Sequence, residues 1–266
     1  MPLRCTALAN PLKFSCTCAA IASALLLCSG YASAAPPSAT AKPAAQPQAA
    51  AWRTPPAARL GFTVQGKVKN FPYQTKAQID WLPQGDRYEA SQELQVPLLG
   101  SRCQSSTGRI GKEGLQPEIF MDRSRNERST TFDAQAGQIR FSRGDTPVAW
   151  ASGIQDRMSV FFQLAGMLAA TPQRYPQGSK IELPTASTSR VTPWVFTVRG
   201  VETLQLPAGT MRALKLEHHS DSADADGIQS AIWLAPQLQY LPVRIRLLED
   251  GGRDEVDLKL HSHTKP

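Results

Sequence analysis

The chain has 266 residues and a formal net charge of +7 at pH 7, with 29 Lys and Arg against 22 Asp and Glu. This length is sufficient to bury a sizeable apolar core. The basic residues are dispersed, with no run of five like charges, which argues against a nucleic-acid-binding protein. The sequence contains no phosphate-cradling loop, dinucleotide fingerprint or nucleophile elbow, so it indicates no cofactor and no particular reaction.

The first 34 residues have the layout of a secretory signal peptide. Arg4 and Lys13 give a basic start, an apolar run covers residues 19–27, and residues 32–34 (Ala-Ser-Ala) offer the small side chains that suit a signal peptidase. The apolar run is too short for a permanent membrane anchor. We therefore expect cleavage after Ala34, a periplasmic location and no transmembrane segment in the mature chain.

The cysteines bear on both anchoring and redox state. Cys28 ends the apolar run, as a lipidated cysteine would, but Leu27 before it is larger than the small residue that lipidation requires. We therefore expect a free domain and not a lipoprotein. Four of the five cysteines lie in the signal, so the mature chain keeps Cys103 alone and cannot form an internal disulfide. We expect this thiol to be buried.

Residues 35–58 consist mainly of Ala, Pro, Gln, Ser and Thr. Such a segment has too little apolar surface to offset the entropy of ordering its backbone. We expect a disordered linker here, which would act as a spacer between the cleavage site and a folded domain over residues 59–266.

From residue 59 onward, short strands alternate with turns. Ala77–Trp81 and Tyr88–Val96 alternate apolar and polar residues, and residues 83–86 (Pro-Gln-Gly-Asp) between them have turn chemistry, which predicts a half-buried hairpin. At a later turn, Gly209 suits the positive φ that other residues resist. The other predicted strands cover Leu60–Val68, Arg102–Ile110, Leu115–Met121, Ser129–Asp133, Gln138–Ser142, Lys180–Leu183, Trp194–Leu206, Met211–His219, Gln229–Leu234, Leu241–Leu248 and Asp254–His261.

One segment has a helical period. Apolar residues recur every three or four positions over Gln155–Ala170, Ser152 lies upstream as a possible cap, and Thr171-Pro172 ends the pattern. A single apolar helix among strands packs against the concave face of a sheet. We therefore predict a mainly β fold, an antiparallel curled sheet or barrel with one embedded α-helix.

Three patches in the second half resemble one protein family. They cover residues 154–164 (beginning Ile-Gln-Asp-Arg-Met-Ser), 201–216 (with Pro-Ala-Gly-Thr-Met-Arg at its centre) and 233–245 (from Trp-Leu-Ala-Pro to Tyr-Leu-Pro-Val-Arg-Ile). In this order and spacing the chain resembles the bacterial exported family DUF3108 over roughly residues 60–262. The resemblance implies a β-rich envelope domain with an embedded helix. It brings no established catalytic residue and no known substrate.

The four histidines are candidate metal ligands. His218 and His219 are adjacent on a predicted strand and therefore face opposite sides, so they cannot share one ion without a bulge. His261 and His263 share a face but lie near the C-terminus. The sequence therefore predicts no metal site and no catalytic residue.

The candidate binding residues come from the helix and two strands. A sheet around a helix can enclose an apolar cavity, and its candidate lining residues are Trp81, Phe161, Phe162, Leu164 and Trp233. Arginine side chains suit an anionic group, and the candidates are Arg157, Arg244 and Arg246. Each set has a plain alternative, in which the aromatic residues form ordinary core and the arginines are solvated.

These features favour a non-enzymatic periplasmic module that binds a lipid-like ligand, a lipoprotein or an envelope partner. Two alternatives stay open. One is a hydrolase of an envelope polymer, which would need a cleft with two carboxylates or a His–acid pair. The other is a scaffold that docks through an exposed strand edge.

Overall fold

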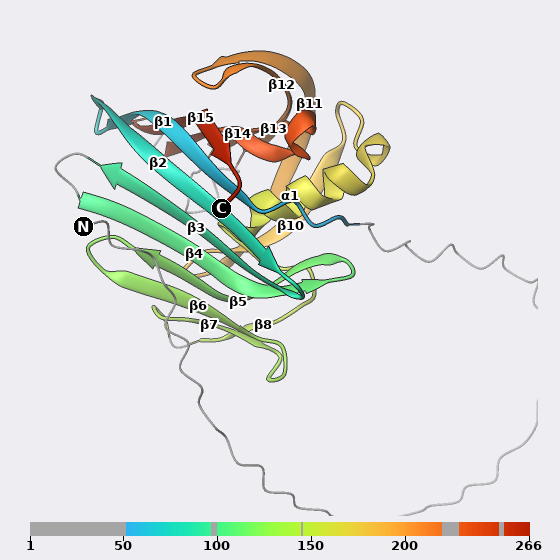
Figure 1. Ribbon diagram of the computed structural model, residues 1–266. Coiled ribbons are helices and arrows are strands. Elements are labelled where there is room, and N and C mark those ends of the chain that lie inside the picture. Colours follow the sequence, from blue (N-terminus) through green and yellow to red (C-terminus); the bar gives the residue numbers. More distant parts are fainter. Residues whose placement is uncertain (1–51, 97–99, 145, 220–228, 250–252) are drawn as a thin grey trace, which may run out of the picture. The chain divides into compact units, whose positions relative to one another are not determined.

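The computed structural model describes residues 52–96, 100–144, 146–219, 229–249 and 253–266 (Figure 1). The predicted signal peptide, its cleavage site, Cys28 and the linker up to residue 51 lie outside the described residues. No helix within those ranges is long and apolar enough to cross a membrane. Cys103 is free and buried, as expected.

The described residues form one fifteen-stranded sheet. Its order is β8-β7-β6-β5-β4-β3-β2-β1-β15-β14-β13-β12-β11-β10-β9, and all neighbours are antiparallel except β9 and β10. The strands are β1 (Ala58–Val68), β2 (Phe71–Gln84), β3 (Arg87–Val96), β4 (Gly100–Gly111), β5 (Gly114–Arg123), β6 (Glu127–Asp133), β7 (Gln138–Phe141), β8 (Val148–Ala149), β9 (Gln155–Asp156), β10 (Lys180–Ala186), β11 (Val191–Leu206), β12 (Gly209–His219), β13 (Gln229–Ala235), β14 (Leu241–Glu249) and β15 (Asp254–Thr264).

Sequence neighbours account for most of the pairing, and one long-range pair joins the two halves. Strand β1 pairs with β2 on one side and with the C-terminal β15 on the other. Each predicted strand overlaps an observed one, and Gly209 has the expected positive φ, at 110°. The prediction of a mainly β, antiparallel curled sheet with one helix is therefore confirmed.

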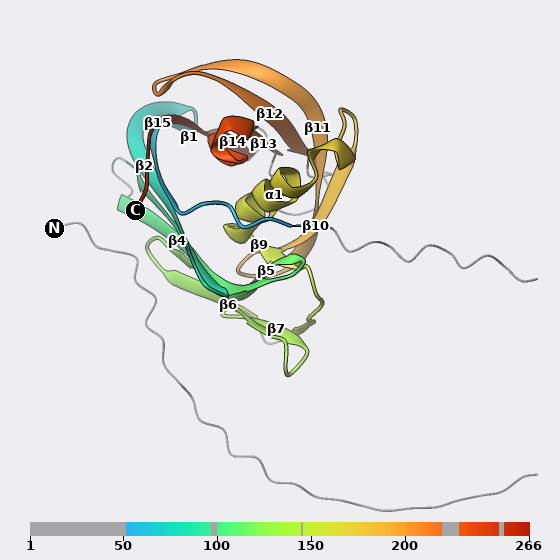
Figure 2. The ribbon, with the colours of Figure 1, turned by 45° about the vertical axis from the view of Figure 1, so that its right-hand side comes forward.

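Helix α1 (Ser159–Ala170) lies on the concave side of the sheet (Figures 1 and 2). Ten of its twelve residues are buried, because the helix is apolar on nearly every side. Phe162 stacks on Trp81 of β2, with the ring centroids 4.3 Å apart and the planes 14° from parallel. Two short 3₁₀ turns, Pro172–Arg174 and Pro236–Leu238, follow α1 and β13.

The predicted start of the helix is wrong by four residues. Gln155 and Asp156 form β9, which pairs with β10, and the helix begins at Ser159. The expected cap Ser152 is exposed in the preceding turn. The Asp156 carboxylate instead accepts the backbone N–H groups of Met158 and Ser159, both at 2.8 Å. This carboxylate satisfies donors at the helix start and thereby sets where the helix can begin.

Residues 52–57 form an extended strap across α1, within the C-terminal part of the segment predicted as a linker. The Arg53 amide donates to the Gly166 carbonyl at 3.1 Å, and the Trp81 indole donates to the Pro55 carbonyl at 3.0 Å. Trp52 packs against the core beside Gly166. A large aromatic side chain and these hydrogen bonds order a segment whose composition otherwise predicts disorder.

The strap depends on the missing side chain of Gly166. A Cβ atom there would lie 2.0 Å from Trp52 Nε1, so Gly166→Ala must displace the indole. We expect this substitution to lower the free energy of unfolding by about 1–3 kcal/mol, despite the better helix propensity of Ala. Denaturant unfolding and a red shift of tryptophan fluorescence would measure the effect. In a Trp52→Ala background the same substitution should cost nothing, and an equal loss in both backgrounds would rule out a clash with the indole as the cause.

Candidate functional site

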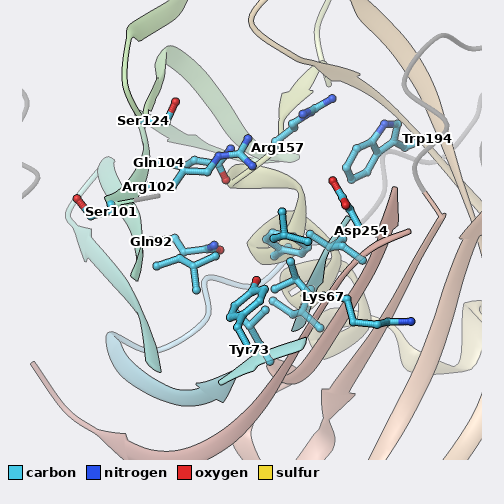
Figure 3. A pocket seen from close by; sticks show the side chains of 18 residues that line it. Lys67, Tyr73, Gln92, Ser101, Arg102, Gln104, Ser124, Arg157, Trp194 and Asp254 are labelled. Atoms are coloured by element: carbon cyan, nitrogen blue, oxygen red, sulfur yellow. The ribbon is translucent and has the colours of Figure 1, made fainter. Parts of the chain in front are cut away.

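A cavity of about 310 Å³ opens on the concave side of the sheet, at the end where β1 joins β2 and β14 joins β15. Its volume lies at the lower end of the range for small-molecule sites. Figure 3 shows its lining, which comes from β1 to β4, β11, β14, β15 and the start of α1. Most of this lining falls into an apolar group and a polar group on β4, and Lys67, Tyr73 and Asp254 also line the cavity.

The apolar wall comes from strands that alternate in burial. On β14, Ile245 and Leu247 point inward while Arg244 and Arg246 point outward. The same period of two brings inward-facing residues of β1, β3 and β15 to the cavity. The apolar lining residues are Val68, Leu94, Phe161, Trp194, Ile245, Leu247, Val256 and Leu258.

The polar wall centres on β4. Arg102 and Gln104 share the inward face of this strand, because they alternate with Cys103. Asp122 of the neighbouring strand β5 accepts two hydrogen bonds from Arg102, at 3.1 Å to Nε and 2.7 Å to Nη2, and one from Gln104 at 3.0 Å. Ser101 and Ser124 line the same side of the cavity, as Figure 3 shows.

Hydrogen bonds and opposite charges hold Arg102, Gln104 and Asp122 in this arrangement. Burial alone would raise the pKa of the Asp122 carboxyl, but the hydrogen bonds from Arg102 and Gln104 and the positive charges of Arg102 and Arg157 lower the pKa below its ordinary value. Asp122 is therefore ionised at neutral pH, and it forms a bidentate ion pair with the Arg102 guanidinium. Because Arg157 acts on the same carboxylate, the two arginines lie on one side of the cavity.

A buried hydrogen-bond network anchors the element that carries Arg157. The Tyr88 hydroxyl lies 2.9 Å from Ser106 Oγ, and Ser106 Oγ donates to Asp156 Oδ2 at 2.5 Å. Asp156 also binds the first amides of α1. Burial raises the pKa of Asp156 to about 6, although the hydrogen bonds from Ser106, Ser159 and Met158 oppose this rise. The network therefore positions Arg157 and the first turn of α1.

The same network contains a serine and a carboxylate, the residue types that a hydrolase uses. Ser106 and Asp156 are both fully buried and neither lines the cavity. Within the described ranges no group of three or more His, Cys, Asp or Glu side chains could hold a metal ion. His218 is buried and stacks on Trp194, with the centroids 5.1 Å apart. Ser106 and Asp156 are therefore not accessible to a molecule in the cavity.

Of the five residues predicted to line an apolar cavity, one lines the observed cavity and four do not. Phe161 lines the cavity. Trp81, Phe162 and Leu164 are fully buried, and they pack in the core between the sheet and α1 without lining the cavity. Their burial follows from the helix, which fills most of the concave face.

Trp233 lies on the outer face of the sheet. Its indole donates to Glu202 Oε2 at 2.7 Å, and the Arg244 guanidinium lies 4.5 Å from its ring centroid. Lys215 packs over the same ring at 5.4 Å. Long charged side chains thus bury this tryptophan on the convex side, away from the cavity.

Of the three arginines predicted to contact an anionic group, one lines the cavity and two lie on the outer face. Arg157 lines the cavity. Arg244 makes two hydrogen bonds to Asp257, at 2.9 and 2.8 Å, and Arg246 binds Glu255 at 2.8 Å, both on the outer face.

Sequence reasoning missed Arg102 and Gln104. The available signal is that residues 101–107 read Ser-Arg-Cys-Gln-Ser-Ser-Thr, so this predicted strand has no continuous apolar face. Its neighbour β3 has one, with Tyr88, Ala90 and Leu94 buried. A strand that is polar on both faces beside a strand with an apolar face indicates inward-pointing polar residues.

Comparisons with known proteins agree with this architecture. The family model described as "Protein of unknown function (DUF3108)" matches residues 73–259. A β-barrel-like protein of the domain of unknown function DUF1849 from Brucella abortus has a similar structure, with a TM-score of 0.54 and 10% identity over 81% of this chain and 100% of that chain. At this identity the likeness shows a shared fold alone. No curated protein matches the chain.

Two further solved structures match more weakly. A protein with a YmcC-like fold from Bacteroides fragilis has a TM-score of 0.32 and 9% identity over 81% of this chain and 100% of that chain. A protein from Vibrio parahaemolyticus, assigned as an outer membrane lipoprotein-sorting protein domain, has a TM-score of 0.27 and 7% identity over 79% of this chain and 85% of that chain. Scores this low carry no conclusion about this chain.

Proposed function

Since this chain belongs to the DUF3108 family, whose members are proteins of unknown function, we propose a function from its own cavity: the domain binds a lipid-like amphiphile on the concave side of its sheet. The observation that carries this proposal is a cavity of about 310 Å³ with an apolar wall on one side and a polar wall on the other. An amphiphile has the same division along its length. We propose a binding module and no enzymatic activity.

The apolar wall supplies the driving force. Each CH₂ group that leaves water for an apolar environment stabilises the complex by about 0.8 kcal/mol. Phe161, Leu247 and Leu258 belong to the rigid scaffold of helix and sheet, so little conformational entropy is lost when a ligand binds. The predicted signal peptide supports a periplasmic location, where an acyl chain has to be shielded from water.

Strand β14 provides a matched test. Leu247 lines the cavity, whereas its neighbour Leu248 points to the opposite face. We expect Leu247→Trp to fill part of the cavity and to weaken binding of a dansyl-labelled undecanoic acid by about tenfold or more, which corresponds to about 1.4 kcal/mol. Leu248→Trp adds the same bulk on the outer face and should leave the affinity unchanged.

The measurement is the rise in dansyl fluorescence on titration of the mature protein, with thermal unfolding of both variants as a folding check. Native mass spectrometry of the gently purified protein provides an independent readout, as a mass increment from a co-purified ligand. If the wild type does not bind the probe, or if both tryptophan variants bind it equally well, the cavity is not the binding site.

A further inference from the structure

We propose that the tip of the β1–β2 hairpin docks on the surface of an anionic phospholipid bilayer, with Phe71 inserted among the lipids and Lys69 beside their head groups. The inference goes beyond the cavity, because neither residue lines it. Only the choice of a bilayer as the partner rests on the proposed function, since a lipid-like amphiphile partitions into membranes and has to be collected from them.

Phe71 is the most exposed large apolar side chain in the part of the chain that the structure describes. Its exposed fraction is 78%, against 50% for Val201, 40% for Ile119 and 39% for Val148. The other seven phenylalanines of the described ranges are at most 9% exposed. An aromatic ring surrounded by water gains free energy when it enters an apolar phase, so the Phe71 ring is suited to contact lipids.

Phe71 continues the concave face of the sheet beyond the cavity. It is the direct cross-strand partner of Val68, and Tyr73 lies two residues further along β2. Directly paired residues, and residues two apart on one strand, project from the same face of an antiparallel sheet. Val68 and Tyr73 both line the cavity, as Figure 3 shows for Tyr73. A hairpin tip that enters a bilayer therefore brings this end of the cavity to the lipids.

Hydrogen bonds hold the backbone of the tip in place. Lys69 and Asn70 form the turn between β1 and β2, with φ angles of 50° and 69°. The Lys69 amide donates to Asp254 Oδ1 at 2.7 Å, and the Asn70 amide donates to the Arg253 carbonyl at 3.2 Å. The turn is thus tied to the start of β15. Because the Phe71 ring projects from a fixed backbone, little conformational entropy is lost when the tip docks.

Turn chemistry does not account for the Lys69 side chain. A turn with positive φ at both central residues favours Asn, Asp or Gly at the first of them, and Lys69 occupies that position. Lys69 is exposed, and its ammonium group forms no ion pair with a residue that the structure describes, whereas Lys67 pairs with Glu255 at 3.1 Å. The Asp254 carboxylate binds the turn from the cavity side. A lysine beside an inserted aromatic ring is attracted to anionic lipid head groups.

Brominated lipids test whether the tip enters a bilayer. We would introduce Phe71→Trp into the mature protein and measure how vesicles of phosphatidylethanolamine and brominated phosphatidylglycerol, in equal parts, quench its fluorescence. Val201→Trp is the control, because Val201 is the next most exposed apolar residue and four strands separate β11 from β1. We expect quenching above that of the wild type for Phe71→Trp alone. Equal quenching of both variants would overturn the inference.

Sedimentation with unbrominated vesicles of the same lipids measures the affinity. We expect Phe71→Ser to lower the partition coefficient about tenfold and Lys69→Asn, which suits the turn, to lower it about fivefold. Val201→Ser and Lys76→Gln are the controls and should leave it unchanged, since Lys76 is an exposed lysine on the outer face of β2. With vesicles of phosphatidylcholine alone, Lys69→Asn should have no effect. Thermal unfolding of each variant checks that it is folded.

The outcomes separate this inference from the proposed function. Phe71→Ser should bind dansyl-labelled undecanoic acid in solution as tightly as the wild type does, because Phe71 does not line the cavity. If the wild type binds this probe but does not bind vesicles, or if Phe71→Ser binds vesicles as tightly as the wild type, the docking inference is wrong and the binding function stands. If the tip enters vesicles but the probe does not bind, the proposed function fails and the docking surface stands.

Discussion

Replacement of Trp81 by Ala should lower the free energy of unfolding by about 3–5 kcal/mol, the usual cost of removing a large aromatic side chain from a core. Trp81 is fully buried, stacks on Phe162 of α1, and lies with its ring centroid 5.4 Å from that of Tyr88. Its indole N–H also donates a hydrogen bond to the Pro55 carbonyl, which holds residues 52–57 in place. One substitution therefore opens a cavity and releases the chain that crosses the helix.

Trp81→Phe separates these two effects. A phenyl ring keeps most of the stacking on Phe162 but leaves the buried Pro55 carbonyl without its donor, at a cost of about 1–3 kcal/mol. Urea unfolding of the wild type and both variants would measure the differences, provided that the m-values agree. A loss below about 1 kcal/mol for Trp81→Ala would show that the space between sheet and helix is loosely packed. Trp81 would then return as a candidate for the binding cavity.

The Asp156 carboxyl should contribute less to stability at neutral pH, where it is ionised, than at about pH 4, where it is protonated in the folded protein. Burial raises its folded-state pKa to about 6 from an ordinary value of 3.8. The unfolded chain therefore loses this proton at a lower pH than the folded chain does. The stability that the protonated group confers is complete below about pH 4, falls as the pH rises through about 6 and then levels off, for a total change of about 3 kcal/mol.

Asp156→Asn removes this titration and keeps an oxygen to accept the amides of Met158 and Ser159. Between about pH 4 and about pH 7.5, we expect the wild type to lose about 3 kcal/mol of stability relative to this variant. Other groups titrate in both proteins and cancel in the difference. One is Glu217, whose pKa is lowered to about 2 by hydrogen bonds from Lys215 and Arg199 despite partial burial.

Denaturant unfolding of both proteins at several pH values would measure this difference. Asp156→Ala is the structural control, because it leaves two amides of α1 without an acceptor and should cost about 1–3 kcal/mol per amide at every pH. A difference between the wild type and Asp156→Asn that stays constant or grows in favour of the wild type with rising pH would show that the network stabilises the ionised carboxylate. Such a result would contradict a raised pKa for Asp156 in the folded protein.

The two predictions concern the same structural unit. Trp81 holds the body of α1 against the sheet, and Asp156 fixes where the helix begins. Phe161 and Arg157 reach the cavity from that helix start. Substitutions in this core can therefore change ligand affinity indirectly, which is why the binding test uses Leu247 of β14, with Leu248 as its matched control on the outer face.

Some of the site could be predicted from the sequence and some could not. Phe161 and Arg157 could be found because they flank the one helical segment, and an embedded helix has to border any space inside the sheet. Trp233 and Arg244 lie on the outer face of the sheet and do not line the cavity. Alternation along a strand separates two faces, but a tryptophan shielded by Lys215 and Arg244 is as buried as a residue of the core.

The sequence by itself determined the elements whose physics is local. The period-two strands, the turn at Gly209 and the apolar helix that ends at Thr171-Pro172 all follow from side-chain pattern and backbone preference. Tertiary structure alone decided what depends on residues distant in the chain. It set the helix start through Asp156 and Ser106, ordered Trp52 against Gly166, and brought Arg102, Asp122 and Arg157 to one wall. The physical reason is that a hydrogen bond or an ion pair between strands depends on register and curvature, which no short window of sequence contains.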